Sequence, residues 1–309
     1  MQATEIAPGV WRLPTSISNV YFVRPPGTRW VLIDTGPEGH AKSIYQAAEE
    51  LFGKNATPEA ILLTHGHFDH AGSSRDLAEF WGVPVFAHSL ERPYLTGASS
   101  YPPADPTVGG AMAFLSRFFP SATTNVGPHL HDLPAGEVPE LPGWSWYHTP
   151  GHAPGHVSFF NRTLSVLISG DAVASVDTDS WIAMTTQARK ISRPPAPFTI
   201  DWTEARRSVD LLARLAPFTI GCGHGAPMSG VEVAQQLTEL VRDFPCPQQG
   251  RYARHAARTD ERGIVSLPPA PPDLLMRNAM LAAGGLAAGS ALGWLAMRSE
   301  RQRARTAGR

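Results

Sequence analysis

Cysteine is scarce in this chain of 309 residues, which contains only Cys222 and Cys246. Two cysteines cannot form the disulfide framework that holds many secreted proteins together, so we expect a reducing compartment. The N-terminal residues, MQATEIAPGVW, lack the basic start and the apolar run of a secretory signal. Together these absences predict a cytoplasmic protein.

A dominant charge is also absent, because 26 Lys and Arg residues are balanced by 27 Asp and Glu residues. Without a basic field, the composition argues against nucleic acid as a partner. Hydrophobic residues make up 42% of the chain, which is an ordinary share for a globular protein with a sizeable core. We therefore expect a globular protein whose partner is not nucleic acid.

Long apolar runs are missing until the C-terminus. Residues 246–272 are rich in proline and arginine and are expected to form a linker after a folded domain over residues 1–245. Residues 279–297 carry no charge and nearly match the ~20 residues that span a bilayer. Their glycines also recur at the four-residue spacing of close-packed membrane helices. We expect an apolar helix over 273–297 that tethers a cytoplasmic protein to the membrane, followed by a basic tail at 298–309. Docking of this helix on the domain over residues 1–245 or on a partner is the alternative.

Strands and helices alternate through the first 245 residues, which predicts an α/β fold. Apolar, β-branched and aromatic runs predict strands at Val10–Leu13, Asn19–Val23, Trp30–Ile33, Ala60–Leu63, Val83–Phe86, Trp144–Tyr147, Val157–Phe160, Ser165–Ser169 and Phe218–Gly221. Helical spacing predicts helices at His40–Leu51, Ser74–Phe80 and Val231–Phe244. A further helix through Leu215 is expected to begin at a capping box formed by Asp201 and Glu204.

Two long connections interrupt this alternation. Leu90–His131 is rich in proline, glycine and aromatic residues, and its aromatic part from Tyr94 to Phe119 includes a predicted helix at Gly110–Phe119. Ala172–Thr199 carries Trp181 and Met184. Insertions of this length in a compact domain are usually functional. We expect both to wall an apolar pocket, with ordinary core packing as the alternative.

A dense H-x-H-x-D-H cluster follows the expected strand Ala60–Leu63 and consists of His65, His67, Asp69 and His70. Imidazole and carboxylate are good ligands for Zn²⁺. Residues at these spacings fan around a helix, so we expect a loop that aims them at one point. A catalytic ion takes about three protein ligands plus water. Four ligands in one loop therefore indicate two ions with more ligands elsewhere.

Further ligand types follow three later strands. His152 lies in HTPGHAPGH, Asp171 in ISGDA and His224 in GCGHGAP. An α/β sheet commonly places its chemistry beyond its strand ends. We therefore expect these side chains to meet the H-x-H-x-D-H cluster.

The motifs THGHFDHAG, TPGHAPGH, SGDA and GHG, preceded by LIDTG, resemble the five ordered motifs of the metallo-β-lactamase superfamily. The resemblance covers roughly residues 8 to 228 and implies a four-layer αββα sandwich. It implies one metal at His65, His67 and His152, and a second at Asp69, His70 and His224. Asp171 would bridge both ions.

The resemblance also suggests roles for residues beside the ligands. Asp34, in LIDTG, would hold the first motif in place, with a role as a strand-end turn residue as the alternative. His156 would support the site or face the substrate, whereas His148 would be structural. His129 and His131 lie in the insertion and are expected at the surface or in the core.

This family chemistry implies a hydrolase in which a metal-bridging hydroxide attacks an ester, thioester, lactone or amide carbonyl of a small-molecule substrate. Two divalent ions are expected, with Zn²⁺ favoured and iron or manganese as alternatives. Asp69 would shuttle a proton as well as bind metal, and Asp171 would act as the bridging catalytic ligand. The reaction requires no nucleophilic serine or cysteine.

Asp171 stands where β-lactamases of this fold often carry cysteine, which favours a glyoxalase-II-like or lactonase-like branch. Residues 172–174 lack the tyrosine that lactonases carry after the bridging aspartate, and the C-terminal helices show no basic cluster for glutathione. Lactonase or β-lactamase-type activity remains an alternative. Another is a mononuclear iron dioxygenase acting on persulfides, which shares the fold. A non-enzymatic binding module is the third, although no expected ligand is missing.

Overall fold

The computed structural model describes residues 2–27, 29–120, 124–136 and 138–275. The chain divides into two compact units, Met1–Pro269 and Ala270–Arg309, and the fold below is that of the first unit. The apolar stretch 279–297 and the basic tail 298–309 lie outside the described residues. Among the helices that are described, none has the length and apolar character needed to cross a membrane.

The first sheet has seven strands that are neighbours in the order of the sequence. Neighbours from the first strand to the fourth pair antiparallel, and neighbours from the fourth strand to the seventh pair parallel. The change occurs at the fourth strand because chain crossovers through helices begin there. The strands are β1 (Thr4–Ala7), β2 (Val10–Pro14), β3 (Asn19–Val23), β4 (Val31–Ile33), β5 (Ile61–Leu62), β6 (Val85–Ala87) and β7 (Leu130–Asp132).

The second sheet has five strands in the order β14-β13-β10-β9-β8. β10 and β13 pair parallel, and the other neighbours pair antiparallel. The strands are β8 (Trp144–His148), β9 (Val157–Asn161), β10 (Val166–Gly170), β13 (Thr219–Cys222) and β14 (Met228–Ser229).

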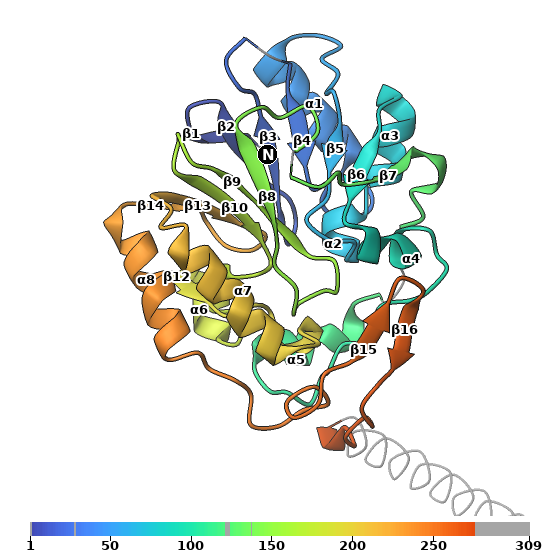
Figure 1. Cartoon of the computed structure of the whole chain (residues 1–309), viewed down its shortest axis with the longest axis vertical. Coiled ribbons are helices and arrows are strands. Elements are labelled where there is room, and N and C mark those ends of the chain that lie inside the picture. The colour runs from blue at the N-terminus through green and yellow to red at the C-terminus, as the bar shows by residue number, and fades with distance from the viewer. Residues whose placement is uncertain (1, 28, 121–123, 137, 276–309) are drawn as a thin grey trace, which may run out of the picture. The chain divides into compact units, whose positions relative to one another are not determined.

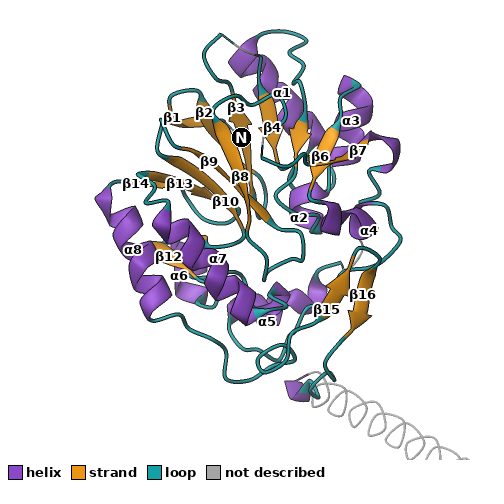
Figure 2. Ribbon diagram, in the orientation of Figure 1, coloured by secondary structure: helices purple, strands orange, loops and turns teal. Residues whose placement is uncertain are grey.

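The two sheets and the helices on their outer faces form four layers (Figures 1 and 2). Successive side chains of a strand point to opposite faces of its sheet. Tyr21 of β3 packs against Phe159 of β9 in the apolar layer between the two sheets. The next residue, Phe22, faces the opposite way and packs in a cluster with two helices, α1 (Ala41–Phe52) and α3 (Ser74–Trp81). A third cluster joins the outer face of the second sheet to α7 (Trp202–Arg214) and α8 (Val231–Arg242). The predicted αββα sandwich is therefore confirmed.

The predicted capping box at the start of α7 is only half present. The Asp201 carboxylate accepts the backbone N–H groups of Thr203 and Glu204 at 2.9 and 3.0 Å. Glu204 does not complete the box, because its carboxylate pairs with Arg207 one turn later. The Asp201 N–H is satisfied instead by the carbonyl of Gly151 at 2.9 Å.

Short elements occupy the two long connections, and most of them were not predicted from the sequence. The helix expected over Gly110–Phe119 is present but shorter and passes into a 3₁₀ turn. The elements of the connections are η1 (Ser89–Glu91), α4 (Arg92–Leu95), α5 (Ala111–Leu115), η2 (Ser116–Phe118), η3 (Gly127–His129), β11 (Ala174–Val176), α6 (Trp181–Thr186), β12 (Arg189–Ser192) and η4 (Ala196–Phe198). A further short helix, α2 (Phe68–Ala71), lies before the first connection.

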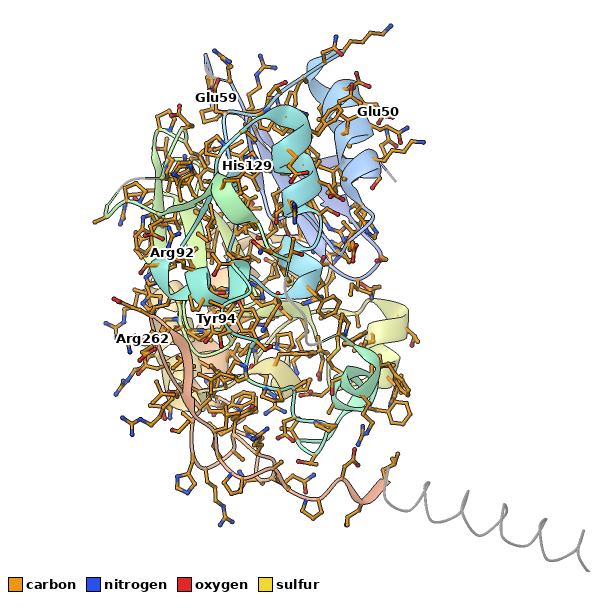
Figure 3. The ribbon with its side chains drawn as sticks, turned by 90° about the vertical axis from the view of Figure 1, so that its right-hand side faces the viewer. Glu50, Glu59, Arg92, Tyr94, His129 and Arg262 are labelled. Atoms are coloured by element: carbon orange, nitrogen blue, oxygen red, sulfur yellow. The ribbon has the colours of Figure 1, made fainter. Side chains whose placement is uncertain are left out.

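The segment expected as a linker differs from that expectation. It forms a hairpin of β15 (Arg258–Asp260) and β16 (Gly263–Ser266), and the first compact unit extends to Pro269. Figure 3 shows Arg262 on this hairpin beside α4, and the Ile264 N–H donates to Ser99 Oγ at 3.5 Å. Apolar residues spaced among the polar ones are buried here, so the segment up to Pro269 is part of the first compact unit.

Tyr252 anchors this segment, because it is 3% exposed and packs in a cluster with Trp202. Its hydroxyl also donates to the carbonyl of Pro103 at 2.7 Å. We expect Tyr252→Ala to lower the free energy of unfolding by about 3 kcal/mol or more, since it leaves a large cavity. Urea unfolding measures this, and Val265→Ala, at an exposed position, serves as the control. Equal stability of the two variants would contradict the packing described here.

Candidate metal centre

The H-x-H-x-D-H cluster spans a loop and the first turn of a helix. His65 and His67 follow β5 on extended chain, whereas Asp69 and His70 lie on α2, which begins at Phe68. This differs from the loop expected for all four residues. The helix supplies only two adjacent residues, so the fan of side chains around its axis does not prevent convergence with the two histidines before it.

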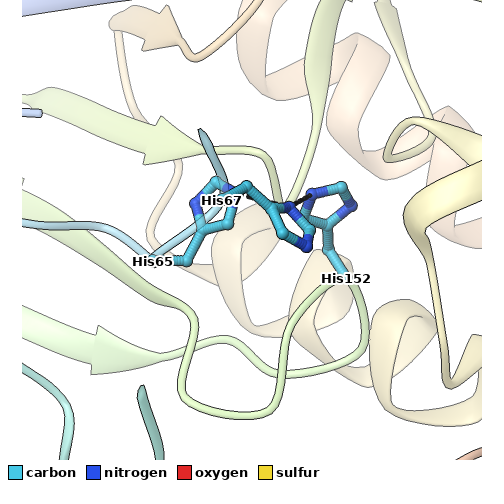
Figure 4. A group of neighbouring side chains, drawn as sticks. All are labelled: His65, His67 and His152. Atoms are coloured by element: carbon cyan, nitrogen blue, oxygen red, sulfur yellow. Dashed lines mark hydrogen bonds between the residues drawn. The ribbon is translucent and has the colours of Figure 1, made fainter. Parts of the chain in front are cut away.

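Three histidines place ring nitrogens at one point (Figure 4). His65 Nε2 lies 3.0 Å from His67 Nδ1, which lies 3.0 Å from His152 Nε2. Burial lowers the pKa of all three rings, that of His67 to about 3. They are therefore neutral imidazoles, the form that binds metal.

A second set contains Asp69, His70 and His224, whose ligand atoms also lie within 4.8 Å of one another. His224 Nε2 is 3.4 Å from Asp69 Oδ2. Burial by itself lowers the pKa of His224, but the carboxylates of Asp171 and Asp69 outweigh it and raise that pKa to about 9. This set therefore favours positive charge, whether a proton or a metal ion.

Asp171 lies between the two sets. Its Oδ1 is 3.4 Å from His70 Nε2, and its Oδ2 is 3.4 Å from His152 Nε2 and 3.1 Å from His224 Nε2. Among the described residues, buried His70 Nε2 and Asp171 Oδ1 form no hydrogen bond. Unpaired buried polar atoms are costly, so their convergence fits divalent ions as the missing partners.

The GHG motif leaves room for this arrangement. A Cβ at Gly223 would lie 2.0 Å from Asp171 Oδ1 and 2.6 Å from His70 Cε1. Glycine is therefore required immediately before His224, because any side chain would occupy the space where both ligands meet.

Asp34 holds the first motif in place. Its carboxylate accepts the Thr64 N–H at 2.8 Å and lies 2.8 Å from His70 Nδ1, so Nε2 of that ring faces Asp171. Asp34 also adopts a positive φ of 59°, a backbone conformation typical of turns. The two roles considered for Asp34 therefore coincide, and partners of this kind fix the orientation of ligand histidines.

His156 supports the backbone of Asp171. Its Nε2 accepts the Asp171 N–H at 2.9 Å, and its Nδ1 lies 2.8 Å from Thr149 Oγ1. The side chain is fully buried and does not line the cavity beside the centre, which is described below. Of the two roles considered for His156, the structure therefore favours support over contact with substrate.

The remaining histidines lie away from the centre. His148 stacks on His88 with 4.3 Å between ring centroids, and its Nε2 lies 2.9 Å from the carbonyl of Pro154. This is the structural role expected for it. His131 is exposed, and His129, labelled in Figure 3, is partly exposed on η3.

Glu91 supports the centre and was not found from the sequence patterns. It is completely buried, and its Oε2 accepts the Gly66 N–H at 2.9 Å and the Tyr101 hydroxyl. Its Oε1 accepts the Gly155 N–H at 2.7 Å. Burial raises the pKa of Glu91 to about 7, although both N–H groups oppose this. One carboxyl group therefore ties the His65–His67 loop to the loop that carries His152.

A cavity of ≈ 370 Å³ opens on both ligand sets. The Leu90–His131 insertion contributes Met112, Leu115 and Phe119 to its wall, as expected of a pocket wall. Of the two residues expected from the second connection, Met184 lines the cavity. Trp181 does not line it and is 51% exposed, since α6 presents that side chain to solvent.

Comparisons with known proteins point to one family. The family model described as metallo-beta-lactamase superfamily matches residues 13–224. The probable metallo-hydrolase YflN of Bacillus subtilis is 43% identical over 241 residues, which cover 77% of this chain and 91% of YflN. The hydroxyacylglutathione hydrolase GloC of Haemophilus influenzae is 30% identical over 139 residues, which cover 44% of this chain and 58% of GloC.

A solved structure shows the same fold. The metallo-beta-lactamase family protein TTHA1429 of Thermus thermophilus superposes with a TM-score of 0.53 at 24% identity. The match covers 78% of this chain and 80% of TTHA1429. With the motifs in order along the sequence and their side chains gathered beside one cavity, this chain belongs to the metallo-β-lactamase superfamily.

Proposed function

We propose that this protein is a hydrolase that uses two divalent metal ions to cleave an ester, thioester, lactone or amide. The observation that carries the proposal is the position of Asp171, whose two oxygens face histidines of both sets. A single carboxylate shared in this way suits a pair of neighbouring cations.

His65, His67 and His152 would hold one ion, and Asp69, His70 and His224 would hold the other, with Asp171 shared. Bound divalent ions lower the pKa of water toward neutrality and polarise a carbonyl oxygen as Lewis acids. Zn²⁺ suits the mixed imidazole and carboxylate ligands, and iron or manganese is the alternative.

The chain itself contributes the proton acceptor and the substrate pocket. Asp69 lines the cavity and is 8% exposed, so it can accept a proton during attack and return it to the leaving group. The apolar wall of Met112, Leu115 and Phe119 would hold the acyl chain and exclude water around the carbonyl.

The relatives support this reaction class. YflN carries the description of a probable metallo-hydrolase, and GloC is named as a hydrolase of a hydroxyacylglutathione. A hydroxyacylglutathione is a thioester, so the second name supports the inclusion of thioesters among the substrates to be tested.

Metal removal is the direct test. We expect the full chain to bind about two ions and to lose hydrolysis on dialysis against a chelator, with recovery on addition of Zn²⁺ or Mn²⁺. Metal analysis with a panel of ester, thioester, lactone and β-lactam substrates measures this. One iron per chain with oxygen uptake on a persulfide would instead establish the dioxygenase alternative. Hydrolysis that survives in the metal-free protein would refute the proposal.

A further inference from the structure

An arginine lines the cavity at a position where the strand pattern predicts an apolar residue. In β2, Arg12 pairs with Tyr21 across the sheet, on the face that carries Val10 into the layer between the sheets. Its neighbour Leu13 points to the opposite face. Arg12 is partly buried and forms part of the wall of the cavity that contains His67 and His224.

Asn19 fixes the direction of this guanidinium. The Asn19 amide nitrogen donates to the carbonyls of Cys222 and Gly225 at 2.8 and 2.7 Å. Its amide oxygen must then face Arg12, and it accepts the Arg12 Nε–H at 2.7 Å. Because Cys222 and Gly225 flank His224, the guanidinium is held at the His224 end of the site.

No counter-charge reaches this guanidinium within the part of the chain that the structure describes. Arg12 forms no ion pair there, and hydrogen bonding involves its Nε alone. Asp69 and Asp171, which also line the cavity, are directed at the histidines. Burial lowers the pKa of Arg12 more than the neighbouring Tyr21 raises it, and the nearby cation of Arg189 lowers it further. A partly desolvated cation without a partner is unfavourable, so its presence indicates an external anion.

We propose that Arg12 binds a carboxylate at the far end of the substrate's acyl chain, so that the enzyme prefers half-esters or half-thioesters of dicarboxylic acids. The position of the scissile carbonyl at the metal ions rests on the proposed function. The two free Nη groups of a guanidinium lie in one plane and match the two oxygens of a carboxylate. Met112, Leu115 and Phe119 provide an apolar wall for the methylene groups between the two ends.

The binding test uses adipate and hexanoate, which differ by one terminal carboxylate. Calorimetry on the full-length, Zn²⁺-loaded protein is expected to show that adipate binds roughly 10-fold more tightly, the value of one charge-assisted contact. Arg12→Gln is expected to abolish this preference, whereas Arg12→Lys keeps the charge and retains part of it. Arg75→Gln removes an equal charge from the exposed face of α3 and is expected to behave like the wild type.

The kinetic test compares mono-4-nitrophenyl adipate with 4-nitrophenyl hexanoate. We expect kcat/KM to favour the anionic ester in the wild type and in Arg75→Gln, and Arg12→Gln to lower that ratio roughly 10-fold or more. A ratio unaffected by Arg12→Gln and Arg12→Lys would overturn the inference, as would equal binding of adipate and hexanoate by the wild type. Tighter binding of 6-phosphonohexanoate than of adipate would overturn the choice of carboxylate.

The two proposals fail in different ways. If both esters are hydrolysed without preference, the hydrolase assignment holds and the carboxylate site is refuted. If neither ester nor any panel substrate is hydrolysed, but the preference for adipate disappears in Arg12→Gln, the hydrolase assignment fails and the carboxylate site stands.

Discussion

Asp171→Ala is expected to empty both metal positions and to reduce kcat/KM by roughly 1,000-fold or more. Lewis-acid stabilisation contributes several kcal/mol, and each 1.36 kcal/mol corresponds to a factor of ten in rate. Both oxygens of Asp171 face histidines, at distances from 3.1 to 3.4 Å, so its removal affects the two sets together. Metal analysis and steady-state kinetics on the same preparation measure the two losses.

Two further variants test whether the loss is specific to the Asp171 carboxylate. Asp171→Asn preserves volume but removes the charge, and we expect it also to lose metal. Asp132→Asn alters an exposed carboxylate that pairs with Arg92 at the surface, and such a pair contributes ~1 kcal/mol or less to stability. Full activity in Asp171→Ala with empty metal positions would refute the proposed chemistry.

Glu91→Ala is expected to lower the free energy of unfolding by about 3 kcal/mol or more. The change leaves the N–H group of Gly155 and the hydroxyl of Tyr101 buried without an acceptor, and it leaves the Gly66 N–H with the Tyr101 oxygen alone. Because these groups hold the two histidine loops together, we also expect metal affinity to fall about 10- to 100-fold, as when other supporting partners are removed. Urea unfolding and competitive metal titration separate the two effects. Unchanged stability and unchanged metal affinity would contradict the bridging role.

Glu91 also predicts a dependence of stability on pH. Burial raises its pKa to about 7 from the ordinary value of 4.5, so the folded chain retains a proton that the unfolded chain releases. Its contribution to stability is therefore largest below pH 4.5 and decreases by roughly 3 kcal/mol as pH rises to 7, at 1.36 kcal/mol per pKa unit.

Glu91→Gln removes this titration. We expect the stability difference between wild type and Glu91→Gln to favour the wild type most at pH 5 and to shrink toward pH 8, in metal-free protein of both forms. The histidines titrate equally in both proteins and cancel in the difference. A difference that is constant with pH would show that Glu91 keeps an ordinary pKa.

The sequence by itself was sufficient to predict the strands and helices and the candidate ligands, and the family resemblance of its motifs supplied the four-layer sandwich. The apolar runs at β3 and β4 and the helical spacing at α1 and α3 are local patterns, and the buried apolar side chains of these elements lie in the two clusters described above. The assignment of the seven candidate ligands as metal ligands stays a prediction; they are His65, His67, Asp69, His70, His152, Asp171 and His224. It was accessible because histidine and aspartate directly after predicted strands form a recognisable combination.

Tertiary structure alone decided the roles of Glu91, Arg12 and Tyr252. Glu91 lies in a short polar turn that resembles any exposed acidic turn, and its partners Gly66 and Gly155 are brought to it by both sheets. Arg12 differs from a solvated strand arginine because Asn19, which bonds to Cys222 at the end of β13, also accepts its Nε–H. Local sequence determines which face of an element is apolar. The partner of a buried charge is set by contacts between segments far apart in the chain, which exist only after the layers have packed.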